Sequence, residues 1–378
     1  MDRNALNKLA GSADIPRELN LVAEKVLNLE RITVEDGLLL YQKGELGFLG
    51  LLADFVRNSK HGEKAFFNRN FHIEPTNICV FNCHFCSYRR KPGEPGSWYY
   101  DMDKILEIAG KYTGKNVTEV HVTGGVHPSH DIHYYGNMIS KIKEVLPGIH
   151  VKAFSAIELD YIIKKAGMSV KDGLSLLQNY GLDSVPGGGA EIFDEEIRKV
   201  VCDEKSSSET WLTLHETAHL LGIPSNATIL YGHIENYKHR IDHLNRIRTL
   251  QDRTHGFNAF IPLKFKSSNN AMWQQGEVSS VEDMKNFAVC RIFLDNIPHL
   301  KAYWPMIGKD MALLSLSFGV DDLDGTIDDS TKIYSMAGAG DSNPAMSSEE
   351  IVTLIKKARR VPIERDSIYR EINTFGSL

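Results

Sequence analysis

The sequence predicts an α/β protein, either a (β/α)8 barrel or a partly open, TIM-like version of it, with an N-terminal helical extension and C-terminal helices. From about residue 70, short β-branched runs alternate with amphipathic helical stretches, which is typical of a parallel sheet. Eight such runs occur, and eight strands are the number that closes this barrel. Several runs end in glycine, proline or a polar residue, as strands do on the face that carries an active site.

The expected strands share β-branched or aromatic residues and a turn signal at their end. Helices are expected from near Asp101, over 208–221 with Gly222 as its C-cap, and from near Ser280, where Ser280 and Asp283 resemble a capping box. The strands are predicted at 71–75, 118–123, 150–155, 182–185, 226–231, 257–264, 301–304 and 318–322.

Three regions follow from this order of elements. Residues 1–65 have helical periodicity and no strand signal, so we expect an N-terminal helical extension. Residues 66–330 hold the barrel. Residues 331–378 are expected to form a loop and a helix packed on the barrel, with Ser347 and Glu350 as a capping box and the helix ending near Arg359.

Charge and composition exclude several classes of function. The net charge is −6, so the chain lacks the positive electrostatic field that attracts nucleic acid. No apolar stretch is long enough to cross a bilayer. The first residues carry charges and no apolar signal core, which predicts a cytoplasmic protein without a membrane partner. The five cysteines form one tight cluster and two isolated residues, Cys202 and Cys290, which does not look like a disulfide framework.

Cys79, Cys83 and Cys86 have the spacing C-x3-C-x2-C and follow the first expected strand. A structural zinc site usually needs four closing ligands, and an electron-carrying [4Fe–4S] cluster normally takes four thiolates. Three thiolates leave one iron open, and an open position is what a catalytic metal keeps. The amino and carboxylate groups of S-adenosylmethionine (SAM) can chelate such an iron. A zinc site completed by a distant histidine and an iron–sulfur electron carrier remain alternatives.

With Phe85 before the last cysteine and the pair Gly124-Gly125 after the second strand, this loop resembles the signature of the radical SAM superfamily. More narrowly, the chain resembles the aminofutalosine synthases of the futalosine route to menaquinone over about residues 65–370. Dehypoxanthine futalosine cyclases and FO synthases share much of the pattern, but they favour Gln where this chain has Thr123. The matching segments are HIEPTNIC at 72–79, TGGVHP at 123–128, KAFSAIE at 152–158, PGGGAE at 186–191, YGHIE at 231–235, IPLKF at 261–265 and AYWPM at 302–306.

The resemblance implies a [4Fe–4S] cluster on the three cysteines and SAM consumed as a cosubstrate. It implies that the 5′-deoxyadenosyl radical adds to 3-[(1-carboxyvinyl)oxy]benzoate, with aryl migration and loss of CO2, and that a flavodoxin- or ferredoxin-type protein supplies a low-potential electron. An aromatic dicarboxylate needs cations or amide donors and a flat apolar wall. Substrate residues are therefore expected at His72, Lys152, His233 and Lys264, walls at Tyr303 and Trp304, and SAM contacts at Phe85, Gly124, Gly125, Glu158, Glu191 and Glu235, with Glu74 as a further candidate.

A competing motif lies at 215–219, where HETAH fits the zinc-binding pattern H-E-x-x-H. The spacing places His215 and His219 on one helical face. The extended form of the motif needs a third histidine where this chain has Ser225. The same segment also fits an outer helix of the barrel, with a buried apolar face that includes Trp211 and Leu214. The run AGAGD at 337–341 lacks a third glycine and predicts a mobile loop rather than a dinucleotide site.

Overall fold

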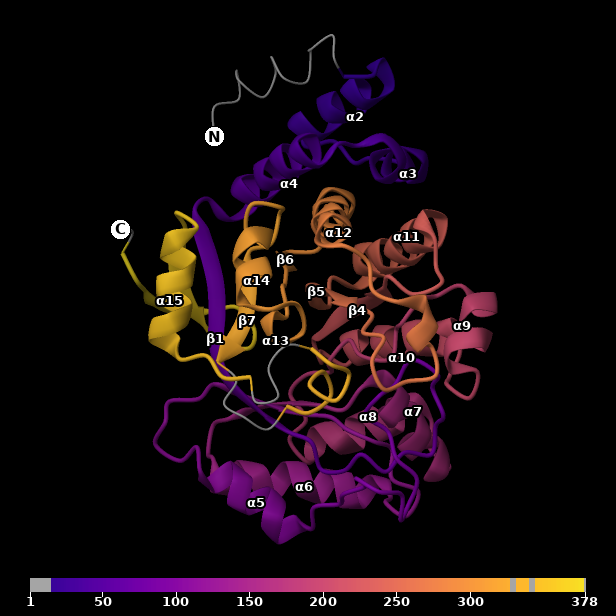
Figure 1. Ribbon diagram of the computed structural model, residues 1–378. Helices are drawn as coiled ribbons and strands as arrows, with labels where there is room; N and C mark the ends of the chain where they lie inside the picture. The colour runs from indigo at the N-terminus through magenta and orange to yellow at the C-terminus, as the bar shows by residue number, and fades with distance from the viewer. Residues whose placement is uncertain (1–14, 327–330, 340–343, 377–378) are drawn as a thin grey trace.

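The computed structural model describes residues 15–326, 331–339 and 344–376. Three helices precede the barrel: α2 (Arg17–Leu27), α3 (Val34–Lys43) and α4 (Leu46–His61). Thr33 and Asp36 form a capping box that starts α3. These helices make an extra layer over two outer helices of the barrel, α11 (Tyr237–Thr254) and α12 (Ser280–Phe293) (Figure 1). The expected boundary near residue 65 falls just after the start of the first strand.

Seven parallel strands form most of a barrel wall. They are β1 (Lys64–Ile73), β2 (Glu119–Val122), β3 (His150–Ala153), β4 (Ser225–Tyr231), β5 (Phe257–Lys264), β6 (His299–Leu300) and β7 (Asp322–Thr326). Pairing runs from β1 through β2 to β3, and separately from β4 through β5 to β6, while β7 returns to β1. Single bridges, Lys152 to Ser184, Val185 to Ser225 and Lys301 to Asp322, connect these sets. The α/β barrel prediction is therefore confirmed, with a wall that is thin at two places.

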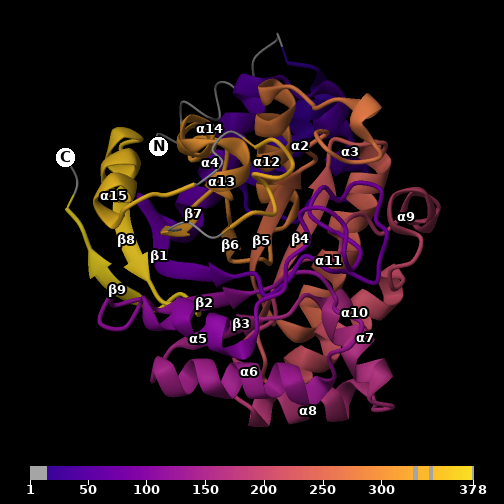
Figure 2. The same ribbon diagram turned by 60° about the horizontal axis from the view of Figure 1, so that its bottom comes forward.

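Amphipathic helices surround this wall, and most of them begin where a capping side chain accepts a backbone N–H. Asp101, Asp131 and Ser207 do so for α5, α6 and α10. Figure 2 shows α5, α6, α7 and α8 below the strands and α10 and α11 beside β4. Around the barrel lie α5 (Met102–Gly110), α6 (Ile132–Val145), α7 (Ala156–Lys165), α8 (Val170–Asn179), α9 (Glu195–Cys202), α10 (Ser208–Leu220), the 3-10 helix η1 (Trp273–Gln275), α13 (Trp304–Ile307), α14 (Lys309–Ser315) and α15 (Ser348–Lys357). None of the described helices is both long and apolar enough to span a membrane.

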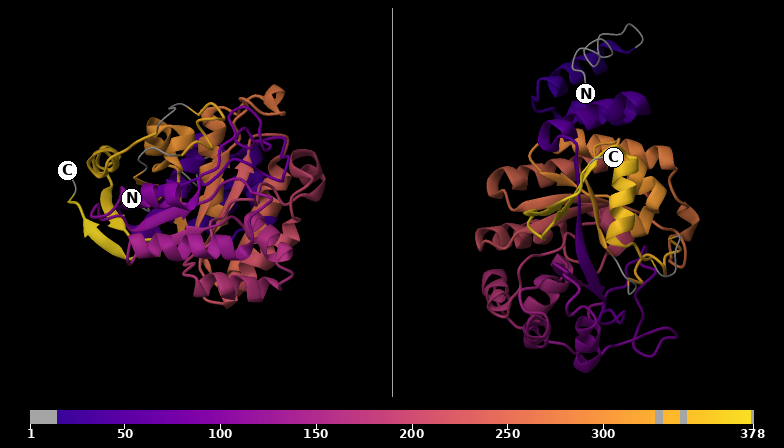
Figure 3. Two further views of the ribbon diagram at one scale, coloured as in Figure 1. Left: turned by 90° about the horizontal axis from the view of Figure 1, so that it is seen from below. Right: turned by 90° about the vertical axis from the view of Figure 1, so that its left-hand side faces the viewer.

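Several expected boundaries differ from the structure. Residues 182–185 contribute only bridges, and residues 318–321 are a turn and connection that lead into β7, which begins at Asp322. The cap of α12 is Ser279, which accepts from the backbone of Glu282, rather than Ser280. The C-terminal part adds β8 (Val361–Arg365), which pairs in parallel with β1, and β9 (Glu371–Thr374), which forms an antiparallel hairpin with β8. A loop and a helix alone were expected here. Figure 3 shows α15 and this hairpin at the margin of the molecule.

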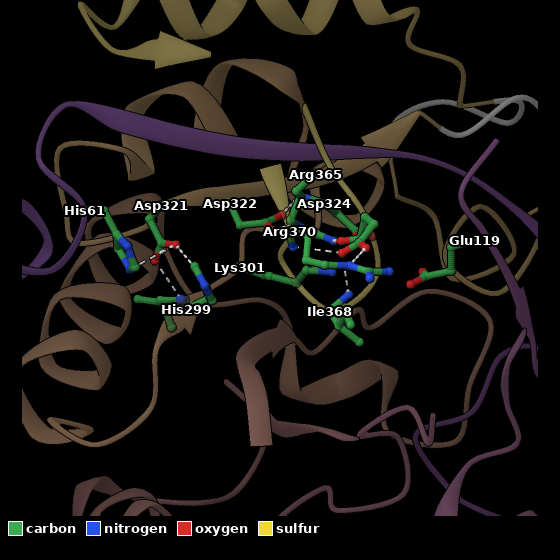
Figure 4. Close-up of polar contacts among 12 residues, drawn as sticks. His61, Glu119, His299, Lys301, Asp321, Asp322, Asp324, Arg365, Ile368 and Arg370 are labelled. Carbon is green, nitrogen blue, oxygen red and sulfur yellow. Dashed lines mark hydrogen bonds and ion pairs between the residues drawn. The ribbon is translucent and has the colours of Figure 1, made fainter. Parts of the chain in front are cut away.

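The amino-terminal end of the barrel is closed by buried ion pairs. Asp321 lies between His61 and His299 (Figure 4), and its carboxylate accepts from His299 Nδ1 at 2.6 Å while it also pairs with Arg291. Burial lowers the pKa of His61 to about 4, so this ring is neutral. Asp322 binds Arg365 at 2.6 Å in the same region. Each carboxylate already has a cationic partner, which indicates a stabilising role for this end.

Candidate active site

The three predicted metal ligands lie on the loop that leaves the carboxyl end of β1. Backbone hydrogen bonds hold this loop at both flanks: Cys79 N donates to Arg90 O at 3.1 Å, and Val80 N donates to Val126 O at 3.0 Å. His84 N donates to Val201 O at 2.9 Å, which joins the loop to the end of α9. The loop is therefore positioned by neighbours on both sides of the barrel mouth.

The chemistry of this donor set suits an iron–sulfur cluster better than one metal ion. Among the described residues, the cysteine sulfurs do not form a group of ligand atoms that all lie within 4.8 Å of one another, as the ligands of one zinc ion would. In a cubane cluster each thiolate binds a different iron, so the sulfurs can lie further apart. Burial raises the pKa of the Cys79 and Cys83 thiols, so metal binding has to supply the thiolate form. Cys290 is fully buried in α12, whereas Cys202 shares a small apolar cluster with Cys83.

The glycine pair packs directly against the cysteine loop. A Cβ on Gly124 would lie 2.7 Å from Thr76 O, and one on Gly125 would lie 2.4 Å from Ile78 O. Gly125 N donates to Thr76 O at 2.7 Å. Glycine is required here because two backbone segments touch, so this pair sets the position of the cysteines as well as offering backbone to a ligand.

Gly125→Ala should therefore disturb the cysteine loop before any ligand binds. The new methyl group meets backbone that has no room to move, and overpacking of this kind costs about 1–3 kcal/mol. We expect purified Gly125→Ala protein to carry clearly less iron per chain and to melt earlier than the wild type. The matched control is Gly47→Ala in α4, where no atom lies within 4 Å of an added Cβ. Normal iron content in Gly125→Ala would contradict this role.

A cavity of about 290 Å³ lies at the carboxyl ends of the strands, and Cys86 lines it. Its base is polar and charged. Lys152 Nζ binds Glu119 at 2.6 Å, and Lys301 Nζ binds Asp324 at 2.6 Å. The remaining lining includes aromatic, glycine and polar residues: Asn70, His72, Glu74, Phe85, Tyr88, His121, Thr123, Gly124, Pro186, Gly187, Gly188, Gly189, Glu191, Lys205, Asn226, Thr228, Lys264, Phe265, Tyr303, Thr331 and Tyr334.

Charge is strongly organised at this base. Burial alone would raise the pKa of Glu119, but Lys152 and Lys301 hold it well below its usual range. Burial also opposes ionisation of Asp324, yet Lys301 lowers the pKa of that carboxyl. Two ammonium groups and two carboxylates thus lie close together in low dielectric. A ligand carboxylate can bind either ammonium without any new buried cation being created.

The two histidines of the cavity are neutral. Burial lowers the pKa of His72 to about 4 and that of His121 to about 3. Their rings lie 5.0 Å apart, and His121 Nε2 has no hydrogen-bond partner among the described residues. An unpaired buried ring nitrogen is a place where a ligand oxygen or hydroxyl can bind. Sequence reasoning named His72 but missed His121, which lies on the neighbouring strand in register with it.

The cavity brings together only part of the residues expected to bind ligands. His72, Lys152, Lys264, Phe85, Gly124 and Glu191 line it, as do Glu74 and Tyr303. Lys264 already donates to Asp283 and to Val278 O, both at 2.8 Å. Trp304 is buried and its indole N–H donates to Gly325 O at 2.9 Å, so it does not provide the expected wall.

Of the residues expected to bind ligands, Gly125 does not line the cavity, and neither do Glu235, His233 and Glu158, whose side chains bond to other parts of the protein. The carboxylate of Glu235 accepts from Gly232 N at 2.7 Å and from Arg240 at 2.8 Å. His233 contacts this carboxylate and Leu230 O, so neither side chain is turned to the cavity. The carboxylate of Glu158 accepts from Ser155 N at 2.7 Å, Thr123 Oγ1 at 3.0 Å and Gly124 N at 3.2 Å, and burial raises its pKa. Glu158 thus positions the glycine pair.

Lys205 is a cavity residue that sequence reasoning missed. Its Nζ binds Glu191 at 2.6 Å and lies 4.9 Å above the ring of Phe85. Burial would lower its pKa, but Cys83 and Glu191 raise it, so the ammonium stays charged beside a predicted cluster ligand. Glu191 itself has a positive φ of 47°, an uncommon conformation for this residue that aims its side chain into the cavity. The sequence signal that could have predicted Lys205 is the alternation of acidic and basic residues after the PGGGAE segment.

The segment 331–339 covers the cavity from the C-terminal side. Thr331 Oγ1 lies 2.9 Å from His72 Nδ1, and the two carboxyl oxygens of Glu74 lie 3.1 and 3.0 Å from Lys332 N, which donates to this group. Tyr334 and Ala337 complete this wall. Residues 340 and 341 of the AGAGD run lie outside the described residues. The end of β1 therefore anchors a cover over the site.

Glu74 should hold a proton at neutral pH, because burial raises its pKa from 4.5 to about 8. The folded protein then keeps a proton that the unfolded chain releases above pH 4.5. The stability that this proton contributes is complete below that pH and is lost as pH rises through about 8, at about 1.4 kcal/mol per pH unit. Infrared difference spectra of wild type minus Glu74→Gln should show a protonated carboxyl band that disappears above pH 8. A band already absent at pH 7 would contradict this assignment.

The side chains of the H-E-x-x-H segment have hydrogen-bond and ion-pair partners within the protein. It lies on α10, outside the barrel wall, as the alternative interpretation expects. His215 Nδ1 and His219 Nε2 both contact Ser225 Oγ, at 2.8 and 2.7 Å, and Glu216 pairs with Arg253. Among the described residues, no third ligand joins them. The motif is a hydrogen-bonded pair, with His215 buried and His219 half-buried, that fixes the start of β4.

Comparisons with known proteins agree with this site. Residues 73–247 match the radical SAM superfamily, and residues 254–375 match the CofH/MqnC C-terminal region. The chain is 42% identical to the aminodeoxyfutalosine synthase of Thermus thermophilus, over 94% of this chain and 96% of that protein. It is 38% identical to the enzyme of the same name from Streptomyces coelicolor, over 96% and 95%. The cyclic dehypoxanthine futalosine synthase of Streptomyces coelicolor is 36% identical, over 90% and 86%.

The fold has solved counterparts. The structure of HydG, a maturase of the [FeFe]-hydrogenase, superposes with a TM-score of 0.73 at 16% identity, over 97% of this chain and 80% of that one. This likeness shows the barrel with its helices, as the resemblance predicted. The sequence matches cover nearly the whole chain and include the cysteine loop and the C-terminal cover of the cavity. The chain therefore belongs to the radical SAM superfamily, in the family that contains the aminodeoxyfutalosine synthases.

Proposed function

We propose that this chain is an aminodeoxyfutalosine synthase. The observation that carries the proposal is the likeness to two curated synthases, at 42% and 38% identity over nearly the full chain. The reaction breaks the C5′–S bond of SAM, which releases methionine, and joins the 5′ carbon of the adenosyl group to the enol-ether double bond of 3-[(1-carboxyvinyl)oxy]benzoate. The aryl group migrates, CO2 leaves, and 6-amino-6-deoxyfutalosine forms.

The cysteine loop and the adjoining cavity wall fit the cofactors of this family. Cys79, Cys83 and Cys86 would hold a [4Fe–4S] cluster, and the cavity that Cys86 lines would take SAM. When bound, the cluster and SAM together supply a 5′-deoxyadenosyl radical upon one-electron reduction. Glu191 and Lys205 offer a carboxylate and an ammonium for the polar groups of SAM. Phe85 offers an apolar surface that Lys205 already covers from one side.

The base of the cavity fits the substrate. A benzoate with a second carboxylate needs two cationic or donor groups, and Lys152, Lys301 and the neutral ring of His121 face this space. The neutral His72 and Tyr303 provide flat surface, with ring centroids 6.4 Å apart. These residues would hold the alkene beside the 5′ carbon at about 3–3.5 Å, the distance of a near-attack geometry. They also exclude water, which protects a reactive carbon radical from other hydrogen donors.

Two further parts of the proposal concern the surroundings of the enzyme. A low-potential carrier of flavodoxin or ferredoxin type supplies the electron, and the chain works in the cytoplasm. The reducing conditions there keep the cysteine thiols free for iron. The absence of a membrane-spanning helix among the described residues agrees with this location without deciding it.

An anaerobic assay tests the function. The holoenzyme is incubated with dithionite, the enol-ether benzoate and SAM labelled in the adenosyl group, and products are identified by mass. We expect the label in an adduct that has lost CO2. Label only in 5′-deoxyadenosine would overturn the proposal and favour hydrogen-abstracting relatives such as the cyclic dehypoxanthine futalosine synthase. If the same assay shows no SAM cleavage at all, the result would favour the alternative that the protein is an iron–sulfur electron carrier.

A further inference from the structure

A second, open hollow lies against the cysteine loop, outside the substrate cavity. Cys86 lines both spaces, so the two approach each other at a predicted cluster ligand. This hollow is formed by the cysteine loop, the turn that follows it and the segment before η1. Its lining residues are Asn82, Cys83, His84, Cys86, Arg89, Arg90, Glu94, Pro95, Asn269, Asn270, Ala271 and Trp273.

Cationic side chains gather at this hollow although the chain as a whole carries a net charge of −6. The guanidinium of Arg89 has no hydrogen-bond or ion-pair partner among the described residues. Arg90 Nη1 donates to Ser87 O at 2.9 Å and to Arg89 O at 2.7 Å, so its charge meets no carboxylate. The exposed Lys91 follows directly. The acidic side chain of the lining, Glu94, accepts from the backbone N–H of Lys91 at 2.5 Å.

The rim of the hollow has an exposed aromatic side chain on one side and an acidic side chain on the other. Trp273 is 63% exposed, which is unusual for the largest side chain, and tryptophan is enriched at the centre of protein interfaces. Across the loop, Glu204 accepts from Asn82 N at 2.7 Å and marks the acidic flank. A partner with acidic surface is therefore favoured on the Arg89 side and disfavoured beyond Asn82.

We propose that this hollow, lined by Arg89, Arg90 and Trp273, is the docking surface for an acidic protein that carries one electron. The inference rests on the proposed function, because it needs a cluster at Cys79, Cys83 and Cys86. The partner's reduced centre loses one electron and the oxidised cluster gains it, so no bond forms or breaks at this surface. Electron tunnelling falls steeply with distance, and a partner in this hollow sits against two of the three cluster ligands.

Binding of a flavodoxin to the holoenzyme tests the proposal directly. The dissociation constant is measured by fluorescence anisotropy of labelled flavodoxin at low and at physiological salt. The charge-reversed double variant Arg89→Glu/Lys91→Glu should bind at least about tenfold more weakly at low salt and lose most of the salt dependence. Trp273→Ala should weaken binding at both salt concentrations, because it removes apolar contact. Arg90 is left unchanged because its backbone and guanidinium hold the cysteine loop.

The control is Lys357→Glu on α15, an exposed lysine across the barrel from α9 in Figure 1. It makes a charge change of the same kind and should leave binding unchanged. Cluster absorbance and dithionite-driven SAM cleavage report whether each variant is intact. Should the double variant lose its cluster, Arg89→Gln and Trp273→Ala still decide the outcome.

Flavodoxin affinity that is equal in the wild type, Arg89→Glu/Lys91→Glu and Trp273→Ala overturns the docking surface. That outcome is separable from failure of the proposed function, which shows as missing adduct when dithionite supplies the electron. Weakened binding with normal dithionite-driven chemistry supports the inference. Loss of binding in Lys357→Glu as well would show a general charge effect and would also count against it.

Discussion

Replacing any one of Cys79, Cys83 and Cys86 with alanine should reduce reductive SAM cleavage to the background rate. Each residue supplies one thiolate from the same loop, while the other cysteine packed beside this loop, Cys202, lies on α9 next to Cys83. A cluster with two protein thiolates should not survive purification, because each missing thiolate leaves one more iron without a protein ligand. Iron content and the visible absorbance of the cluster should fall together with activity.

Cys202 is the informative control for this series. It lies beside Cys83 in the same small apolar cluster, so it is the free cysteine best placed to act as a fourth ligand. In the three-thiolate arrangement, Cys202→Ala costs packing alone, and iron content and SAM cleavage stay near wild type. Cys290→Ala in the core of α12 serves as the distant comparison. Loss of the cluster in Cys202→Ala would contradict the arrangement in which one iron has no protein ligand. It would favour an electron carrier whose cluster is bound by four thiolates.

The sequence predicted the parts of the site that lie at strand ends. A cysteine loop after the first strand and glycines after the second both depend on local spacing, and the structure places them in contact. Their close approach explains why the residues have to be glycine, a point that spacing alone could not reveal. The barrel was predictable for the same reason, since alternating periodicities are local. Thin pairing at Ser184 and Val185 was not, because an isolated bridge has no pattern of its own.

Charge pairs between strands were harder to predict from the sequence. Glu119 lies 33 residues from Lys152 and Asp324 lies 23 residues from Lys301, so each pair joins successive strands across intervening helical segments, and no local pattern links the acid to its lysine. Sequence reasoning therefore named Lys152 alone. It also favoured Glu235 and His233 because they follow a strand, although the side chains turn to Arg240 and to each other. A polar residue at a strand end indicates which face it shares, and the packing of the next helix decides whether it reaches the cavity.

Lys301→Met should uncouple SAM cleavage from adduct formation. The resemblance suggested testing Lys264 and His233, but His233 is turned away from the cavity. The Lys264 ammonium donates to both Asp283 and Val278 O, whereas the hydrogen bond of Lys301 among the described residues goes to Asp324. Lys301 and Lys152 are the ammonium groups at the base. Losing one charged hydrogen bond to a substrate carboxylate costs about 1.5–3 kcal/mol. We therefore expect KM for the enol-ether benzoate to rise roughly 10- to 100-fold, with more 5′-deoxyadenosine released per adduct formed.

A purely structural role for Lys301 has to be separated from substrate binding, because its loss leaves Asp324 buried without a cation. Breaking such a pair costs about 3–5 kcal/mol. The double variant Lys301→Met/Asp324→Asn removes both charges and should recover most of the thermal stability. If Lys301 binds substrate, this variant keeps the high KM and the raised release of 5′-deoxyadenosine, while exposed Lys238→Met behaves as wild type. Recovery of KM together with stability would show that Lys301 acts only by holding Asp324, and Lys152 would then be the remaining anchor for the carboxylate.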